Sequence, residues 1–219
     1  MAATRASGVP VLEIDTPHGR AKAHLHVTDE PVGALVLGHG AGGGVTAPDL
    51  VAVTDVARSE GFSVALVEQP YRVAGRRSPP RADRLDVAWA AVVEHLRDGE
   101  LRSLPLVVGG RSAGARVACR TAADSGAVAV LCLAFPLHPP GRSQTAKAKT
   151  RQPELNAVQV PVLVVQGDRD PFGRPRAGSS RSVVTVPGNH GLKADLDAVA
   201  AAVRDWLPGV VGLTAARQA

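Results

Sequence analysis

Short apolar runs alternate along the chain with segments of helical periodicity, and few architectures accommodate such an alternation. The runs cover residues 34–37, 64–67, 106–108, 128–133, 162–165 and 183–186. Continuous Val, Leu and Ala runs of this length are typical of parallel strands that are buried on both faces. Strands that alternate with helices predict an α/β protein with a doubly wound, mostly parallel sheet, in which ligands bind at the carboxyl ends of the strands.

The segments around these runs complete the expected architecture. Residues 9–14 and 20–27 predict an N-terminal antiparallel hairpin that turns at Pro17-His18-Gly19. Helices are expected over about 48–61, 83–98, 113–126 and 193–207, where apolar residues recur at helical spacing and Pro or Gly marks several of the ends. Because no internal repeat and no linker is recognisable, we expect one domain over residues 9–210, flanked by flexible tails at 1–8 and 211–219.

The pentapeptide Gly110-Arg111-Ser112-Ala113-Gly114 matches the pattern G-x-S-x-G and lies between an expected strand and an expected helix. A serine on a sharp strand-to-helix turn projects its hydroxyl away from the sheet, and the flanking glycines let neighbouring segments approach closely. The N-terminus of the helix favours the negative charge that develops when the serine attacks a carbonyl group. Pattern and position together predict that Ser112 is a nucleophile rather than a buried serine in a glycine-rich turn.

A serine nucleophile needs a base, and the base needs a carboxylate that orients it; in this arrangement the acid and then the histidine follow the serine along the chain. Asp168 and Asp170 both follow the run 162–165, so either could be the acid. We favour Asp170, because Asp168 lies nearer the strand and is expected to bind backbone amides of its own turn. His190, on the loop after the run 183–186, is the predicted base.

A glycine-rich segment, residues 38–44, follows the run 34–37. Acyl transfer creates an oxyanion that needs preorganised N–H donors. One donor is expected to be the backbone N–H of Ala113 and the other that of Ala41, with Gly42 as the alternative. The segment lacks the Lys-Ser/Thr ending of a phosphate-binding loop and the G-x-G-x-x-G spacing of a dinucleotide site, so neither is expected here.

Two further segments are expected to border the substrate. The predicted substrate-binding residues are Gly40, Gly42, Tyr71, Arg72 and His138. His138 could equally stiffen its proline-rich turn, and the arginine cluster at positions 72, 76, 77 and 81 is more typical of a solvated loop than of a site that attracts a carboxylate or phosphate. Residues 141–159 leave no room for a large lid, so we expect an open, shallow site that disfavours long acyl chains.

The net charge and the cysteine content indicate which partners and sites are not expected. The formal net charge of +5 is accompanied by no nucleic-acid-binding motif and no interleaved aromatic residues, so no specific nucleic acid is expected as a partner. Cys119 and Cys132 lack metal-ligand spacing and are expected to be buried free thiols, which fits a reducing cytoplasm. No signal peptide or membrane-spanning run is recognisable, and the predicted chemistry requires neither a metal nor an organic cofactor.

These motifs resemble the α/β-hydrolase superfamily, and within it a small dienelactone-hydrolase-like group that includes a regulatory subunit of the NSL histone-acetyltransferase complex and a testis-expressed protein. The resemblance covers about residues 33–207 and rests on the runs 39–43, 70–72, 109–114, 135–141 and 166–173. It implies the α/β-hydrolase fold without a large lid domain, with Ser112, Asp170 and His190 as a catalytic triad. Dienelactone hydrolases themselves typically use a cysteine where this chain has Ser112, so dienelactone is not the expected substrate.

Two functions are compatible with the sequence. The first is a carboxylesterase-like serine hydrolase that cleaves small esters or related acyl compounds through an acyl-enzyme, with a small-molecule acyl substrate as its partner. The second is a non-catalytic interaction or scaffold protein that keeps the fold and acts in a homodimer or a protein complex. The presence of all three candidate catalytic residues favours the enzyme, because a scaffold has no physical need for them.

Overall fold

The apolar runs form one sheet in the order β1-β2-β4-β3-β5-β6-β7-β8. The computed structural model describes residues 8–139 and 150–218 of the chain. Within them the strands are β1 (Val11–Thr16), β2 (Gly19–His26), β3 (Gly33–Gly38), β4 (Phe62–Glu68), β5 (Leu106–Arg111), β6 (Ala129–Leu133), β7 (Val162–Gly167) and β8 (Arg181–Val186). Strands β3 to β8 pair in parallel, whereas β1 and β2 form the expected antiparallel hairpin and β2 also runs antiparallel to β4.

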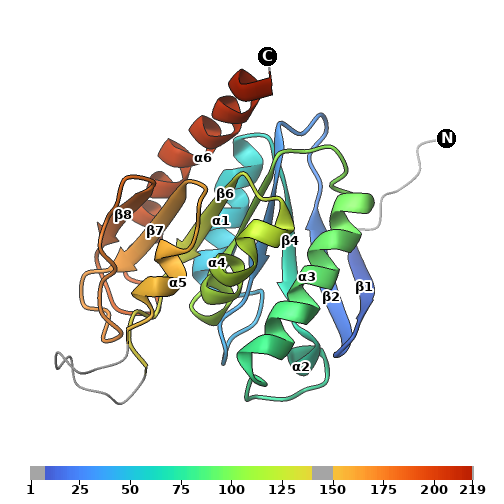
Figure 1. Cartoon of the computed structure of the whole chain (residues 1–219), viewed down its shortest axis with the longest axis horizontal. Coiled ribbons are helices and arrows are strands. Elements are labelled where there is room, and N and C mark those ends of the chain that lie inside the picture. Colours follow the sequence, from blue (N-terminus) through green and yellow to red (C-terminus); the bar gives the residue numbers. More distant parts are fainter. Residues whose placement is uncertain (1–7, 140–149, 219) are drawn as a thin grey trace.

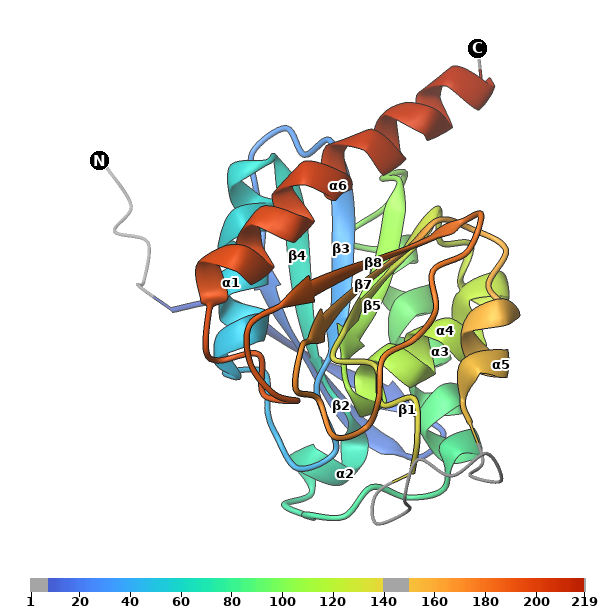
Figure 2. The ribbon, with the colours of Figure 1, turned by 90° about the vertical axis from the view of Figure 1, so that its left-hand side faces the viewer.

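Helices cover both faces of this sheet (Figure 1). They are α1 (Pro48–Ser59), α2 (Pro70–Val73), α3 (Ala82–Asp98), α4 (Ala113–Ser125), α5 (Gln152–Asn156) and α6 (Leu196–Gln218). Figure 2 shows α1 and α6 on one side of the strands and α3, α4 and α5 on the other. Each side has its own apolar core, with Trp89 and Val117 in one and Leu50 and Val203 in the other. The result is the three-layer α/β arrangement that the alternation of patterns predicts.

The long helices form where the spacing of apolar residues predicts them. In α3, Leu85, Trp89, Val92 and Leu96 lie on one face and are buried against the sheet. Helix α4 ends before Gly126, whose φ of 65° is the left-handed conformation that commonly terminates a helix and that glycine adopts without strain.

The parallel register brings the loops after several strands to one edge of the sheet. Gly38, at the end of β3, pairs with Gly110 of β5, and Arg111 of β5 pairs with Leu133 of β6. Strands β7 and β8 continue the sheet in the same direction. The candidate functional residues, which follow these strands in the sequence, therefore converge at the edge formed by the carboxyl ends.

The last helix departs from the prediction. It was expected to end at residue 207, before Pro208, but α6 continues through Pro208 to Gln218, so the predicted tail 211–219 begins inside a helix. Val210 is buried against the same core as Leu207, and this contact favours continuation of the helix although Pro208 cannot donate a backbone hydrogen bond. The other predicted tail, 1–8, lies almost wholly outside the described residues. Helices α2 and α5 were not expected, because helices this short leave no periodic signal.

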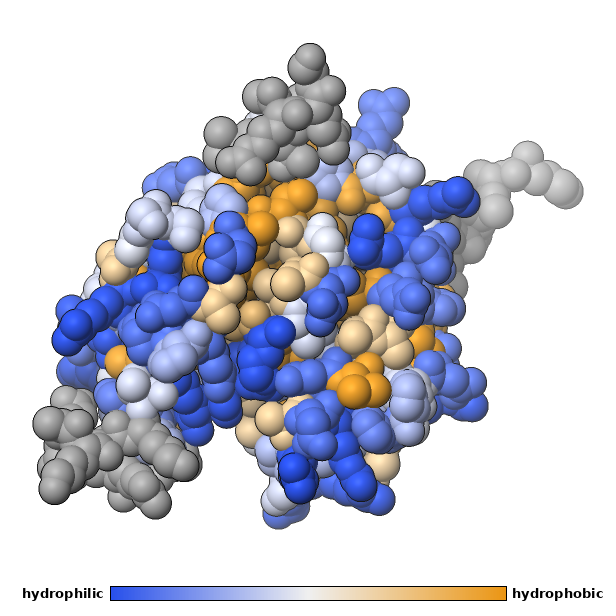
Figure 3. Space-filling view, in the orientation of Figure 1, coloured by the Kyte–Doolittle hydropathy of each residue, from blue (hydrophilic) through white to orange (hydrophobic). Residues whose placement is uncertain are grey.

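The surface over α3, α4 and α5 is mainly polar. Figure 3 shows hydrophilic residues over most of this face, with apolar residues gathered in its upper middle part. None of the described helices is long and apolar enough to cross a membrane.

Candidate active site

Ser112 lies at a strained turn between β5 and α4. Its φ of 53° and ψ of −107° lie in a region that side chains rarely adopt, and its backbone N–H donates to the Leu133 carbonyl at 2.9 Å. A side chain at Gly110 or Gly114 would collide with the carbonyl oxygen of Gly38. Two glycines are therefore needed because β3 passes directly beneath the turn that presents the serine hydroxyl.

The three predicted catalytic side chains are joined by hydrogen bonds. His190 Nε2 lies 2.8 Å from Ser112 Oγ, and His190 Nδ1 lies 2.8 Å from Asp170 Oδ2. Because a carboxylate only accepts hydrogen bonds, Nδ1 carries the proton of the neutral ring and Nε2 is left to accept one from the serine hydroxyl. This is the arrangement in which an imidazole can take a proton from serine.

Asp170, rather than Asp168, faces the histidine. Besides the His190 ring, its carboxylate accepts hydrogen bonds from Gln166 Nε2 at 2.8 Å and from the Phe172 backbone N–H at 2.9 Å. Asp168 instead accepts from the backbone N–H of Gly188 at 2.7 Å, which ties the loop after β7 to the loop after β8. Asp170 therefore accepts a hydrogen bond from the His190 imidazole, whereas Asp168 accepts one from the backbone.

Gln166 is a supporting residue that the sequence analysis did not single out. It is fully buried at the end of β7, and its amide nitrogen also donates to the carbonyl oxygens of Phe135 and Gly173. These bonds orient the amide so that its N–H faces Asp170. Phe172 adds a second support, since its ring packs edge-on against the His190 ring with centroids 4.4 Å apart.

Arg111, the variable residue before the serine, connects the turn to two other segments. Its Nη2 donates to the backbone carbonyl of His190 at 3.0 Å, and its Nε lies 2.9 Å from Asp49 Oδ2 in an ion pair. Asp49 is completely buried at the start of α1. Burial raises the pKa of the Asp49 carboxyl, and the positive charge of Arg111 opposes this rise.

No pattern in the sequence pointed to the contact between Arg111 and Asp49, because the two residues are brought together only by the packing of α1 against the sheet. An arginine within G-x-S-x-G was visible, but the direction of its side chain was not. The same guanidinium also lies where a side chain on Gly40 would point, since a Cβ there would stand 2.8 Å from Arg111 Nη1. Arg111 thus packs between the glycine-rich segment and the histidine loop.

The glycine-rich segment is held from the side of β4. His39 is buried, its Nδ1–H donates to the Gly40 carbonyl at 2.8 Å, and its Nε2 accepts the backbone N–H of Gln69 at 3.1 Å. Burial lowers the pKa of this imidazole, which favours the neutral form that these two bonds require. The Tyr71 hydroxyl donates to the Ala41 carbonyl at 2.9 Å.

Titration of Tyr71 tests whether this donor is buried. Burial raises the pKa of its phenol from 10.0 to about 12. Tyr71 is the only tyrosine in the chain, so the ultraviolet absorbance of phenolate reports on it alone. We expect a midpoint of about 12 in the folded protein and about 10 in urea. Since the neutral phenol is the donor, the stability that it contributes is complete below about pH 10 and is lost as the pH rises to about 12.

Circular dichroism at each pH serves as the control that the chain is still folded during this titration. Equal midpoints for the folded and the denatured protein would contradict a buried Tyr71 donor.

Ser112 is one of the residues that line a cavity of about 350 Å³. Its wall is mostly apolar with three arginines, and is formed by Ala41, Pro79, Pro80, Ala82, Leu85, Ser112, Ala113, Arg116, Arg120, Pro136, Arg151 and Phe172. Ala41 and Ala113, the residues expected to donate to an oxyanion, both belong to this wall. Within the described part of the chain, none of the five predicted substrate-binding residues does, so their role stays a prediction.

The structure gives several of those five residues other surroundings. Gly40 lies against Ser112 and Arg111, while a side chain at the exposed Gly42 would meet open space. Tyr71 holds Ala41, Arg72 Nη1 donates weakly to the Arg76 carbonyl at 3.4 Å, and the His138 backbone N–H donates to Phe172.

The arginines of the cavity wall differ in their charge partners. Arg116 pairs with Glu154, and Arg120 pairs with both Asp86 and Glu154, which ties α4 to α3 and α5. Arg151 donates to the Pro136 and His138 carbonyls, and no carboxylate of the described residues lies within ion-pair distance of it. Burial and the nearby Arg116 lower the pKa of Arg151.

The cysteines take no part in these contacts. Cys119 and Cys132 are buried and free, as predicted, with their sulfur atoms 3.5 Å apart. Their mutual hydrogen bond, together with burial, raises the pKa of the Cys132 thiol, and because both side chains are buried, neither is accessible for nucleophilic attack. Over the described residues, no group of three or more His, Cys, Asp and Glu side chains could hold a metal ion.

Comparisons with known proteins identify the family and the fold. A family model described as an alpha/beta hydrolase domain matches residues 31–193, more than half of the chain. Among solved structures, an a/b serine hydrolase without lid from Xanthomonas campestris aligns with a TM-score of 0.68 at 20% identity, over 94% of this chain and 99% of that one.

Two further structures are similar at comparable identity. Est1E from Butyrivibrio proteoclasticus has a TM-score of 0.75 at 17% identity, over 92% of this chain and 99% of that one. Dienelactone hydrolase from Anabaena variabilis has a TM-score of 0.71 at 18% identity, over 91% and 96%. At these identities the likeness concerns the fold, which is that of an alpha/beta hydrolase with an N-terminal antiparallel hairpin and, over residues 8–139 and 150–218, no lid domain.

Proposed function

Because the chain belongs to the alpha/beta hydrolase domain family, whose model matches residues 31–193, we propose that it is a carboxylesterase-like serine hydrolase that cleaves small esters or related acyl compounds. The observation that carries this proposal is the pair of 2.8 Å contacts that join Ser112, His190 and Asp170, residues 78 and 20 positions apart in the sequence. A base within hydrogen-bond distance of a serine, itself oriented by a carboxylate, is the arrangement that activates serine for attack.

The reaction proceeds in two halves. Ser112 Oγ attacks the carbonyl carbon of the substrate while His190 Nε2 takes the hydroxyl proton, and Asp170 stabilises the imidazolium that forms. His190 then gives this proton to the leaving alcohol, which departs and leaves an acyl group on Ser112. In the second half His190 Nε2 takes a proton from a water molecule as the water oxygen attacks the acyl carbon. His190 then returns this proton to Ser112 Oγ while the bond between Oγ and the acyl carbon breaks, so that the acid product leaves and the serine hydroxyl is restored.

The oxyanion that forms in each half needs donors that are already in place. We assign these to the backbone N–H groups of Ala113, at the N-terminus of α4, and Ala41. Ala41 is supported from behind by the Tyr71 hydroxyl, and the neighbouring Gly40 by His39. These contacts are consistent with a loop whose position does not have to change during the reaction.

Labelling by a fluorophosphonate tests the proposed nucleophile. The probe phosphonylates an activated serine with loss of fluoride, so we expect one covalent adduct on the wild-type protein and none on Ser112→Ala, as measured by intact-protein mass spectrometry. Ser180→Ala, which removes an exposed serine that does not line the cavity, is the matched control and should label like the wild type. A wild-type protein that remains unlabelled, or an adduct that persists in Ser112→Ala, would refute the proposal and favour an interaction protein.

The size of the cavity limits how much a longer acyl chain can gain. The cavity beside Ser112 holds about 350 Å³ and the described residues form no lid domain over it, so methylene groups that extend past its edge find no apolar wall. A methylene group that stays in water lacks the free energy of about 0.8 kcal/mol that burial would give it. This corresponds to a value of kcat/KM about fourfold lower than for a buried methylene group. Along a series of p-nitrophenyl esters and thioesters we therefore expect kcat/KM to stop rising once the acyl chain is longer than the cavity, so that long chains have no advantage over short ones. A steady rise toward long chains would contradict the open site.

A further inference from the structure

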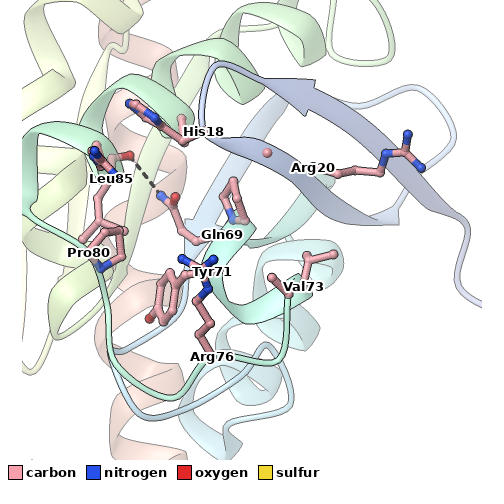
Figure 4. A pocket seen from close by; sticks show the side chains of 13 residues that line it. His18, Arg20, Gln69, Tyr71, Val73, Arg76, Pro80 and Leu85 are labelled. Atoms are coloured by element: carbon pink, nitrogen blue, oxygen red, sulfur yellow. Dashed lines mark hydrogen bonds between the residues drawn. The ribbon is translucent and has the colours of Figure 1, made fainter.

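A second pocket, of about 470 Å³, lies on the other side of the wall of the nucleophile's cavity. It is formed by the turn of the β1–β2 hairpin, by α2 with the segment after it, and by the start of α3 (Figure 4). Its lining includes the three arginines Arg20, Arg76 and Arg84, together with Gln69, Tyr71 and Leu85. Only Pro80 and Leu85 also line the cavity of Ser112, so these two residues separate the pockets. The volume is in the range of small-molecule sites.

The lining is positively charged and contains no aspartate or glutamate. Arg20 is neutralised by Glu13 and Asp15, at 2.9 and 3.2 Å, and Figure 4 shows its side chain turned away from the pocket. The Arg76 side chain instead reaches into the pocket toward Gln69. No carboxylate of the described residues lies within ion-pair distance of Arg76. A guanidinium in this position is suited to bind a carboxylate or a phosphate through two parallel hydrogen bonds.

Gln69 supplies the second polar feature of this pocket. Its residue is only 6% exposed, yet its side-chain oxygen has no hydrogen-bond partner among the described residues. The orientation of the amide is set, because its nitrogen donates to the Leu85 carbonyl at 3.2 Å, the contact drawn as a dashed line in Figure 4. The oxygen is therefore left on the side away from Leu85. A buried acceptor without a donor is uncommon in native proteins and is satisfied when a ligand brings a hydroxyl or N–H group.

Between these polar groups the wall is apolar. Pro70, Val73, Ala74, Leu85 and Ala88 form most of it, and the Tyr71 ring closes one side. A ligand that is polar throughout would leave this surface uncovered, whereas a compact apolar body fits against it.

We propose that this pocket is a binding site, separate from the cavity of Ser112, for a small organic anion that carries a hydroxyl group on an apolar body. The anionic group pairs with Arg76, the hydroxyl donates to the side-chain oxygen of Gln69, and the apolar body packs against the wall formed by α2 and α3. The site does not depend on the proposed hydrolase activity, since its ligand makes no contact with Ser112.

Calorimetric titration of the full chain with 3-hydroxybenzoate, 4-hydroxybenzoate and benzoate tests the assignment. The three probes share the anion and the ring, and the two hydroxybenzoates place the hydroxyl at two different separations from the carboxylate. We expect at least one of them to bind about tenfold more tightly than benzoate, because it gives Gln69 a donor. Absence of binding by all three, or equal affinity for all three, would refute the proposal.

Variants locate the ligand. Arg76→Met is expected to weaken binding of the preferred hydroxybenzoate by about tenfold or more, since the carboxylate loses a charged donor. Arg77→Met removes the same charge from the next, exposed position, which does not line the pocket, and is expected to change the affinity by less than about twofold. Similar losses in both variants would indicate attraction by net charge alone and would overturn the assignment.

Two more variants separate the remaining alternatives. In Gln69→Met the ratio between the affinities for hydroxybenzoate and benzoate should fall to about one, and because this ratio is taken within a single variant it is insensitive to a general loss of stability. In Arg151→Met, which removes a cation from the wall of the Ser112 cavity, the affinity should be unchanged. Weakened binding in Arg151→Met would place the ligand beside Ser112 and refute a separate site.

Discussion

Replacing Asp170 by asparagine is expected to lower kcat by about three to four orders of magnitude while the chain remains folded. The Asp170 carboxylate faces donors on both of its oxygens, because His190 and Gln166 donate to one oxygen and the Phe172 backbone N–H donates to the other. An asparagine amide must therefore turn its NH2 group toward an existing donor. Facing His190, it forces the ring into the tautomer that cannot accept the serine proton; facing Phe172, it leaves the imidazolium without a negative charge.

The matched control is Asp168→Asn, two positions away. Asp168 accepts from the Gly188 backbone N–H, and an asparagine oxygen can keep this bond, so kcat should change by no more than about threefold. Steady-state kinetics on a short-chain p-nitrophenyl ester measure both variants, with circular dichroism to verify that they are folded. Equal losses at the two positions, or a greater loss at Asp168, would show that Asp170 does not serve His190.

Replacing Arg111 by methionine is expected to destabilise the protein by about 3 kcal/mol and also to lower kcat. The substitution leaves the fully buried Asp49 carboxylate without its cationic partner, and an unpaired buried charge costs far more than a lost surface ion pair. It also removes the donor to the His190 carbonyl, so that the loop carrying the imidazole loses one of its attachments. Urea denaturation measures the free energy of unfolding, and kinetics measure kcat.

The double variant Asp49→Asn with Arg111→Met separates these two effects. Since asparagine carries no charge, the double variant should recover much of the lost stability, but kcat should stay low because the bond to the His190 carbonyl is still missing. The interaction between the two substitutions is read from the double-mutant cycle. Additive losses of stability would contradict a coupled buried pair, and recovery of kcat along with stability would contradict a positioning role for Arg111.

Much of the fold could be predicted because its signals are local. Buried parallel strands require continuous apolar runs, and the helices that cover them require apolar residues at helical spacing, so both patterns are legible in a single segment. The turn at Ser112 was recognisable for the same reason, since close packing against Gly38 tolerates only glycine at positions 110 and 114. Ser112, Asp170 and His190 could be recognised in this order along the chain because each of them follows a predicted strand.

Other features depend on contacts between distant segments, which leave no pattern in the sequence. The predicted end of α6 was wrong because burial of Val210 outweighs the local tendency of Pro208 to end a helix. The preference for Asp170 over Asp168 had a physical reason, but only the directions of their side chains decide which one reaches His190.

The amino-acid sequence alone therefore determined the class of fold, the tight turn that carries Ser112 and the loops that surround it, because strand burial and tight turns impose their requirements on consecutive residues. Tertiary structure alone decided that Arg111 lies between Asp49 and His190, that Gln166 donates to Asp170, and that Gln69, whose side-chain oxygen has no partner among the described residues, lines a second pocket. Each of these depends on segments that are far apart in the sequence, since even the Gln166 amide is also held by the Phe135 carbonyl, and it exists only once the sheet register and helix packing have formed.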